Sequence, residues 1–201
     1  MSERSELLLI YTGGTIGMVE DVETGALHPI NFDQLQVEIP ELKKFDCNIT
    51  VKSLLSPIDS SNMNVQVWKE LLQIIESSYE KFDGFVIMHG SDTMAYTASA
   101  ISFLLENVNK PIIFTGSQLP IGKIRTDGKE NLITAIEIAA AKENGKPIVP
   151  EVALYFEYSL YRANRTTKFS AENFEAFQSP NYPLLAEAGV HIKYNRFAIR
   201  K

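Results

Sequence analysis

Three short stretches of this chain gather hydroxyl, carboxylate or ammonium side chains, and glycines accompany the first two of them. The first is Thr12-Gly13-Gly14-Thr15, the second is His89-Gly90-Ser91-Asp92-Thr93, and the third is Thr166-Thr167-Lys168. A hydroxyl becomes a nucleophile when a neighbouring group takes its proton, and a lysine paired with a carboxylate and a hydroxyl can relay that proton. Thr15, Ser91, Asp92 and Lys168 would together fit nucleophilic hydrolysis of an amide, provided that they meet in one crevice.

Each motif taken alone has an ordinary structural explanation. Gly13-Gly14 alone predicts only a tight turn, and Ser91 or Asp92 could simply cap a following helix. A carboxylate at a helix N-terminus can, however, also bind the ammonium group of a ligand. His89 follows an apolar run, so we expect a hydrogen-bonded core histidine rather than a general base.

The elements around these motifs alternate between strands and helices. Apolar runs at residues 7–11, 49–55, 85–88, 111–114 and 152–156 have the length of buried strands. Helical spacing lies between them, at 32–39, 67–79, 93–106 and 127–140. This order is typical of parallel βαβ units, so we expect an α/β fold with a largely parallel sheet and a closing hairpin over residues 190–199. Ligands bind such sheets at the carboxyl ends of the strands, where Thr15 and Ser91 would lie.

Several local features carry narrower predictions. Residues 17–31 are polar and contain Gly17, Gly25 and Pro29, which indicates a loop over the strand end that could act as a lid. Asn31 and Asp127 are each expected to cap the helix that follows them.

Composition excludes several classes of function. The 201 residues are 45% hydrophobic and 22% charged, with a formal net charge of −6, which is ordinary globular composition. No basic run indicates nucleic acid, and no apolar stretch is long enough for a membrane or a signal peptide, so we expect a cytoplasmic protein. Cys47 is the sole cysteine, and we expect it in the core. The sequence contains neither a metal-ligand cluster nor a nucleotide-binding motif, so no cofactor is expected.

Taken together, the three motifs resemble those of the bacterial L-asparaginases, and most closely their cytoplasmic (type I) branch. The similarity extends through residues 94–100, 115–118 and Asp127-Gly128, so it covers nearly the whole chain. It implies a three-layer α/β/α, Rossmann-like domain that hydrolyses L-asparagine to L-aspartate and ammonia.

The resemblance also implies roles for particular residues. Thr15 would attack the side-chain amide and form a β-acyl-enzyme. Ser91, Asp92 and Lys168 would form a second triad that orients and activates hydroxyl or water. Asp59 and Ser60 would hold the α-carboxylate and amino end of the substrate, with Asp92 also contacting the α-amino group. Backbone N–H groups near Ser91 could stabilise the oxyanion.

The chain departs from the family pattern in three places. Ser91 stands where the family carries threonine, and residues 16–31 contain no tyrosine to serve as the lid tyrosine. Family members also carry a smaller C-terminal domain that completes the site across an intimate dimer. We therefore expect residues 1–201 to be the N-terminal α/β domain of a parent that forms a homodimer or homotetramer.

The sequence leaves two other functions open. The chain could be a non-catalytic domain that binds an amino acid or serves in assembly. It could also be the asparaginase-like subunit of a tRNA-dependent amidotransferase. The sequence does not decide between asparagine and glutamine as substrate.

Overall fold

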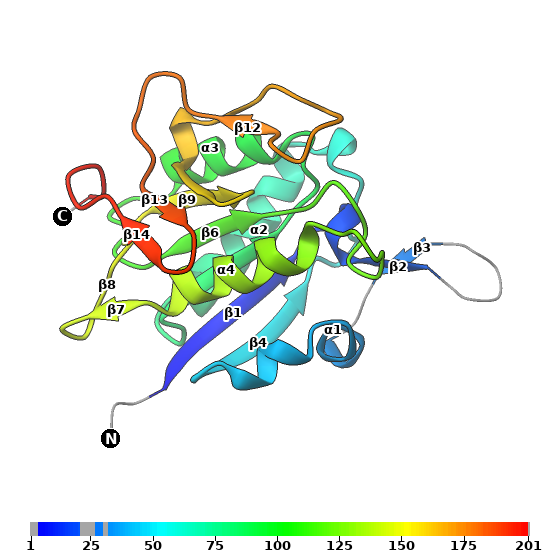
Figure 1. Cartoon of the computed structure of the whole chain (residues 1–201), viewed down its shortest axis with the longest axis horizontal. Coiled ribbons are helices and arrows are strands. Elements are labelled where there is room, and N and C mark those ends of the chain that lie inside the picture. Colours follow the sequence, from blue (N-terminus) through cyan, green and yellow to red (C-terminus); the bar gives the residue numbers. More distant parts are fainter. Residues whose placement is uncertain (1–3, 21–26, 30–31, 201) are drawn as a thin grey trace.

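The fold is built on one eight-stranded sheet in the strand order β14-β13-β10-β9-β6-β5-β1-β4 (Figure 1). The computed structural model describes residues 4–20, 27–29 and 32–200. Strands β4, β1, β5, β6 and β9 run parallel, and β10, β13 and β14 continue the sheet antiparallel. The sheet is therefore largely parallel, as the alternating pattern predicts. Its strands are β1 (Ser5–Tyr11), β4 (Cys47–Ser53), β5 (Gly84–Met88), β6 (Ile112–Thr115), β9 (Val152–Phe156), β10 (Ser159–Arg162), β13 (Ala186–Ala188) and β14 (Ile192–Tyr194).

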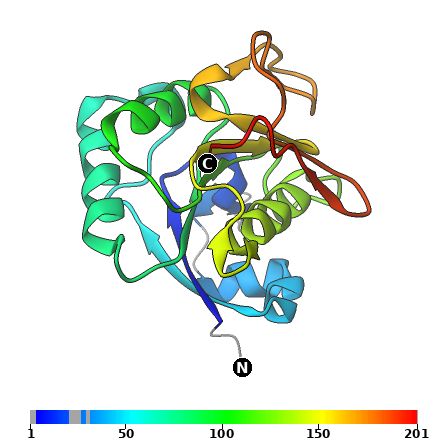
Figure 2. The same cartoon turned by 90° about the vertical axis from the view of Figure 1, so that its left-hand side faces the viewer.

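Side chains alternate between the two faces of this sheet and form two separate cores. Leu7 and Leu9 point into one core, whereas Leu8 and Ile10 point into the other. Helices α1 (Phe32–Glu38) and α4 (Gly128–Ala140) cover the first face, and α2 (Val65–Ser78) and α3 (Met94–Leu104) cover the second (Figure 2). The predicted three-layer α/β/α arrangement is confirmed.

The strand order reverses beside β1, and this point decides where a ligand can bind. The chain leaves β1 for β4 on one side, then crosses over to β5 on the other side. β1 and β5 end together, with Tyr11 paired to Met88. In open α/β sheets the crevice beyond such a reversal is the usual ligand site. The motifs that begin at Thr12 and His89 follow these two strand ends directly.

The expected lid segment has some regular structure. Strands β2 (Met18–Glu20) and β3 (Leu27–Pro29) pair antiparallel, so residues 17–31 are not simply an irregular loop. The predicted cap Asn31 lies outside the described residues.

The closing hairpin forms earlier than predicted. Strands β13 and β14 pair around residues 189–191, and no strand follows Tyr194 among the described residues. The Asn195 side chain accepts hydrogen bonds from the backbone N–H groups of Phe197 and Ala198, both at 3.3 Å. This local turn ends the strand, so the expected alternation through residue 199 was wrong.

Two expected helix caps are also corrected. Asp127 is the N-cap residue of α4, as expected, but it makes no side-chain cap bond. Its carboxylate accepts instead from the backbone N–H groups of Gln118 and Leu119. Thr93 is the N-cap residue of α3 and makes no side-chain cap bond, so the capping explanation for Ser91 and Asp92 does not hold.

Three further findings concern the general predictions from composition. Cys47 is only half-buried against the first core, and burial raises the pKa of its thiol. None of the helices in the described part of the chain is both long and apolar enough to cross a membrane. Within those same residues, no group of three or more histidine, cysteine or acidic side chains could hold a metal ion.

Candidate active site

Two glycine turns contact each other at the carboxyl ends of β1 and β5. Gly14 has φ +85°, and a Cβ added there would lie 2.3 Å from the Cα of Gly90. A Cβ on Gly90 would in turn lie 2.4 Å from the Ser60 hydroxyl oxygen. Only glycine leaves room for this approach. Thr15 and Ser91, each directly after one of these glycines, are thereby brought to the same place as Ser60.

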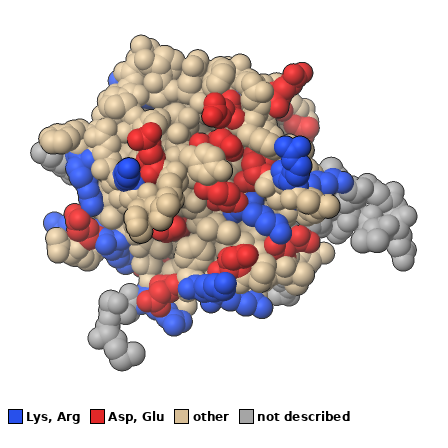
Figure 3. Space-filling model, viewed as in Figure 1, with Lys and Arg blue, Asp and Glu red and all other residues tan. Residues whose placement is uncertain are grey.

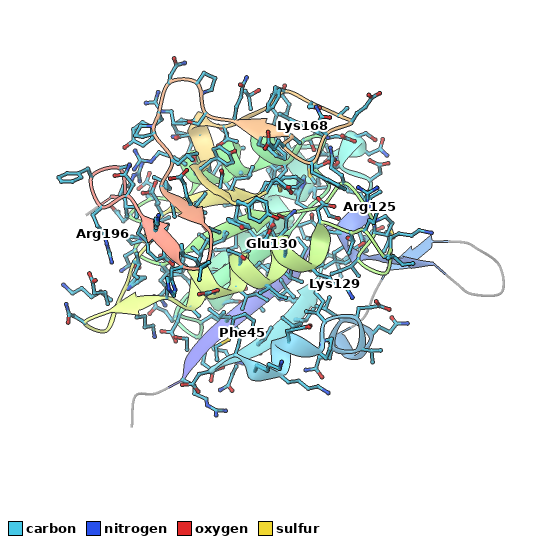
Figure 4. The ribbon with its side chains drawn as sticks, viewed as in Figure 1. Phe45, Arg125, Lys129, Glu130, Lys168 and Arg196 are labelled. Carbon is cyan, nitrogen blue, oxygen red and sulfur yellow. The ribbon has the colours of Figure 1, made fainter. Side chains whose placement is uncertain are left out.

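The second and third motifs meet through Lys168. Its Nζ donates to Ser91 Oγ at 2.9 Å and to Asp92 Oδ1 at 2.7 Å. The Lys168 side chain is 13% exposed, whereas that of Asp92 is 65% exposed. Lys168 comes from β11 (Thr167–Lys168), which pairs with β12 (Phe177–Gln178) at the top of the molecule in Figure 4. The predicted contact between lysine and carboxylate is present, and the lysine does not point into bulk solvent.

Thr15 begins a 3₁₀ turn, Thr15–Gly17, packed on an aromatic ring. A Cβ on Gly17 would lie 2.2 Å from the ring of Tyr11. The Tyr11 hydroxyl donates a long hydrogen bond of 3.4 Å to the carbonyl oxygen of Gly14. Burial raises the pKa of Tyr11 to about 12, so its phenol stays neutral near pH 7 and supports the turn rather than acting as a base.

Hydrogen bonds tie the segment after β4 to both motifs. Ile58 N donates to Thr12 O at 3.0 Å, and the Thr93 hydroxyl donates to Ser60 O at 2.7 Å. Asp59 is exposed, and the backbone N–H of Ser61 donates to its Oδ1 at 2.8 Å. This hydrogen bond lowers the pKa of Asp59. The segment that carries Asp59 and Ser60 is therefore held against both motifs.

His89 is a buried structural residue, as expected. Its Nδ1 lies 2.7 Å from the carbonyl oxygen of Gly90 and must donate to it, which leaves Nε2 to accept from the Thr97 hydroxyl at 3.0 Å. Trp68 Nε1 donates to that same hydroxyl at 3.1 Å. Burial lowers the pKa of His89 to about 4, so the ring is neutral near pH 7 and fixes the Gly90 turn.

Gln118 contacts the site and was not among the predicted residues. The Ser91 hydroxyl donates to Gln118 Oε1 at 3.0 Å. Gln118 follows β6, the strand next to β5, at the same edge of the sheet. That position after a strand end is the signal that could have indicated it.

A groove elsewhere on the molecule takes no part in this site. It has a volume of about 770 Å³ and lies near the amino ends of β6 and β9. Its lining includes Asn109, Pro150 and Arg200, and none of the predicted site residues.

In Figure 4, Arg125 and Lys129 lie beside the start of α4, while Arg196 lies on the opposite side. Figure 3 shows acidic side chains between these basic groups, so this face carries no uniform charge.

Curated proteins similar to this chain include asparaginases and two differently named classes. L-asparaginase 1 of Escherichia coli K12 is 45% identical over 193 residues, covering 95% of this chain and 55% of that protein. The 60 kDa lysophospholipase of Mus musculus is 39% identical, covering 100% of this chain and 38% of that protein. A subunit of the glutamyl-tRNA(Gln) amidotransferase of Thermoplasma acidophilum is more distant, at 31% identity over 94% of this chain and 46% of its own length. The chain thus spans about half the length of L-asparaginase 1. It spans a smaller share of the lysophospholipase and of the amidotransferase subunit.

A solved structure and a family model agree with this relationship. The crystal structure of L-asparaginase I from Vibrio cholerae superposes with a TM-score of 0.85 at 40% identity, covering 98% of this chain and 57% of that chain. The model described as "Asparaginase, N-terminal" matches residues 6–200. The chain therefore belongs to the asparaginase family, and it corresponds to that family's N-terminal part.

Proposed function

We propose that this chain carries the catalytic part of an L-asparaginase, which hydrolyses L-asparagine to L-aspartate and ammonia. The observation that carries the proposal is the contact of Lys168 Nζ with both Ser91 Oγ and Asp92 Oδ1, beside the Gly14–Gly90 contact. In this arrangement an ammonium group, a carboxylate and the Ser91 hydroxyl are in contact at a strand end, next to the glycine turn that precedes Thr15. Amide hydrolysis through an acyl-enzyme needs such groups close together.

In the proposed reaction Thr15 Oγ attacks the side-chain amide carbon of asparagine. The C–N bond then breaks, and the nitrogen leaves as ammonia with the proton that the hydroxyl gave up. Water attacks the resulting β-acyl ester, which releases aspartate and restores the Thr15 hydroxyl. Ser91, Asp92 and Lys168 orient the attacking groups and move the proton between them. Backbone N–H groups near Ser91 would stabilise the oxyanion, a contribution typically worth about 10² to 10³ in rate.

Substrate binding is assigned to the acidic and hydroxyl groups at the rim of the crevice. Asp92 is exposed enough to bind the α-ammonium group of the substrate. Asp59 and Ser60 would hold the α-carboxylate and amino end, with the Ser60 hydroxyl, rather than the Asp59 carboxylate, facing the anion. We place the protein in the cytoplasm, in keeping with its single cysteine, and its longer parent in a homodimer or homotetramer.

The decisive experiment compares ammonia release from L-asparagine by the unaltered chain and by Thr15→Ala. Turnover that Thr15→Ala abolishes supports the proposal. If both proteins give only background while calorimetry detects asparagine binding, the chain is a binding or assembly domain instead. A form extended at its C-terminus to the length of the relatives should be measured in parallel, to test whether the additional segment raises turnover.

A further inference from the structure

The side-chain amide of Gln118 is held in one orientation. Its Nε2 donates to the carbonyl oxygens of Ala171 at 3.1 Å and of Asn173 at 2.9 Å. Carbonyl oxygens only accept hydrogen bonds, so the NH₂ group has to face them. The amide oxygen of Gln118 must then face Ser91, 3.0 Å from its hydroxyl oxygen.

This orientation fixes the direction of the Ser91 hydroxyl. An amide oxygen cannot donate, so Ser91 gives its proton to Gln118 Oε1. The Ser91 oxygen then presents a lone pair to Lys168 Nζ, 2.9 Å away, and Lys168 is the donor in that contact. The hydrogen bonds therefore run in one direction, from Lys168 to Ser91 to Gln118.

The segment that Gln118 binds begins directly after Lys168. Residues 169–176 connect β11 to β12 and fold back on themselves. The N–H groups of Phe169 and Ser170 both donate to Ala176 O, at 2.9 and 3.4 Å. Asn173 N donates to Ser170 Oγ at 3.1 Å. Gln118 thus contacts both the hydroxyl of Ser91 and the loop that directly follows Lys168.

The backbone of Gln118 is held at a third place, the start of α4. Its backbone N–H donates to both carboxylate oxygens of Asp127, at 3.1 and 2.9 Å, and Leu119 N donates to Asp127 Oδ1 at 3.1 Å. Asp127 is buried and also accepts from Asn131 Nδ2. The backbone that carries the Gln118 side chain is therefore fixed to the N-terminal end of α4.

We propose that Gln118 is a positioning residue that couples the 169–176 loop to Ser91. It keeps the Ser91 proton directed away from Lys168 and holds the lysine-bearing loop at a fixed distance from that hydroxyl. Before Ser91 can pass its proton to any other group in the site, its hydrogen bond to Gln118 has to break. This inference rests on the proposed function for its kinetic consequence, but its structural part stands on the contacts alone.

The structural part is tested by amide hydrogen exchange at residues 169, 170 and 173 in the chain itself. Gln118→Glu keeps the size and the acceptor for Ser91, but its carboxylate cannot donate to the two loop carbonyls. We expect Gln118→Glu and Gln118→Met each to raise the rate of amide hydrogen exchange in the loop at least tenfold. Ser91→Ala leaves the loop contacts of Gln118 in place, so exchange should match the unaltered chain. Gln73→Met, on the exposed side of α2, is the matched control and should change nothing.

The kinetic part is tested by the split between kcat and KM for asparagine. Because Gln118 positions Ser91 and Lys168, Gln118→Glu and Gln118→Met should lower kcat by about tenfold or more. KM should stay within about threefold, since the residue is not assigned to substrate.

Two outcomes would overturn the inference. One is unchanged loop exchange in both Gln118 variants; the other is faster loop exchange with an unchanged kcat, which would leave Gln118 a purely structural role. Background turnover in the unaltered chain and in Thr15→Ala alike would instead count against the proposed function. The exchange measurements would still decide whether Gln118 couples the loop to the site.

Discussion

At the scale of single residues, the Ser91 hydroxyl is held by hydrogen bonds on two sides. Threonine's extra methyl group normally restricts χ1, but Lys168 Nζ and Gln118 Oε1 already restrict the Ser91 oxygen. We therefore predict that Ser91→Thr keeps kcat/KM for asparagine within about threefold of the unaltered protein. Ser91→Ala, which removes both hydrogen bonds, should lower it by about 10².

Steady-state ammonia release by the three proteins checks this prediction. A sharp loss in Ser91→Thr would mean that the site is packed for serine and that the two hydrogen bonds do not set its position. The roles of Thr15, Asp59 and Ser60 stay predictions until such measurements are made.

The predicted site residues share one property, which is that their side chains are nucleophilic, acidic or basic. Thr15, Ser91, Asp92 and Lys168 carry groups that acyl transfer needs, so residue type and motif together indicated them. Gln118 follows a strand end, but its amide is not a group that acyl transfer needs, and its side chain contacts two carbonyl oxygens far along the chain. Contacts of this kind depend on the folded backbone and cannot be derived from residue type.

At the scale of elements, the close approach of the two glycine turns should make Gly14 intolerant of any side chain. Gly14 and Gly145 have similar φ, +85° and +77°, but a Cβ on Gly145 would meet nothing within 4 Å. Gly145→Ala should therefore cost only the backbone strain, about 1 to 2 kcal/mol. Gly14→Ala adds a clash with the Gly90 backbone, so we expect a loss of about 4 kcal/mol or more.

Urea unfolding of the two alanine variants measures this difference directly. Equal losses would show that backbone strain alone accounts for Gly14. They would also show that the β1 and β5 turns can separate without cost.

The larger elements could be predicted because their signal is local and repeats. Strands β5 and β9 are continuous apolar runs, as is the part of β1 from Leu7 to Tyr11, and α2 has helical spacing along its whole length. The small hairpins had weaker signals. β7 (Lys142–Glu143) and β8 (Lys146–Pro147) pair around Asn144-Gly145, a dipeptide typical of tight hairpin turns, but the two strands are only two residues long each. The β11–β12 pairing joins Thr167 to Gln178 and Lys168 to Phe177. The loop between these strands is held by Gln118, and no local pattern indicates that contact.

At the scale of the whole molecule, one buried ion pair connects the end of the described chain to the sheet. Arg162 Nε and Nη2 donate to Glu151 at 2.6 and 3.0 Å, and Arg200 N donates to the same carboxylate at 2.8 Å. The Glu151 side chain is 3% exposed. Arg162→Ala would leave this charge buried without its partner, so we predict a loss of about 3 to 5 kcal/mol.

The matched control for this prediction is the exposed ion pair between Arg196 and Glu143, 2.9 Å apart. Arg196→Ala should cost less than about 1 kcal/mol, because water screens an exposed pair. Chemical denaturation of both variants compares the two. Similar losses would mean that burial of Glu151 does not govern the strength of its ion pair.

Folding stability of the whole chain should depend on pH through His89. Burial lowers the pKa of His89 to about 4 in the folded protein, against 6.5 for the free side chain. Between these values the unfolded chain binds the proton and the folded chain does not, so stability is fully present above pH 6.5 and is lost as the pH falls towards 4. From pH 7 to pH 5 the free energy of unfolding should fall by about 2 kcal/mol on account of this one residue.

Other groups titrate in the same range, so the test of His89 is a difference between variants. His89→Gln should lose less stability than the unaltered chain from pH 7 to pH 5, by about 2 kcal/mol. Exposed His191, changed to Gln as a control, should leave the pH dependence as it was. If His89→Gln followed the unaltered chain over that interval, the imidazole would have to be protonated within the fold. Its Nε2 could then no longer accept from Thr97, and the Gly90 turn would have to be held by other contacts.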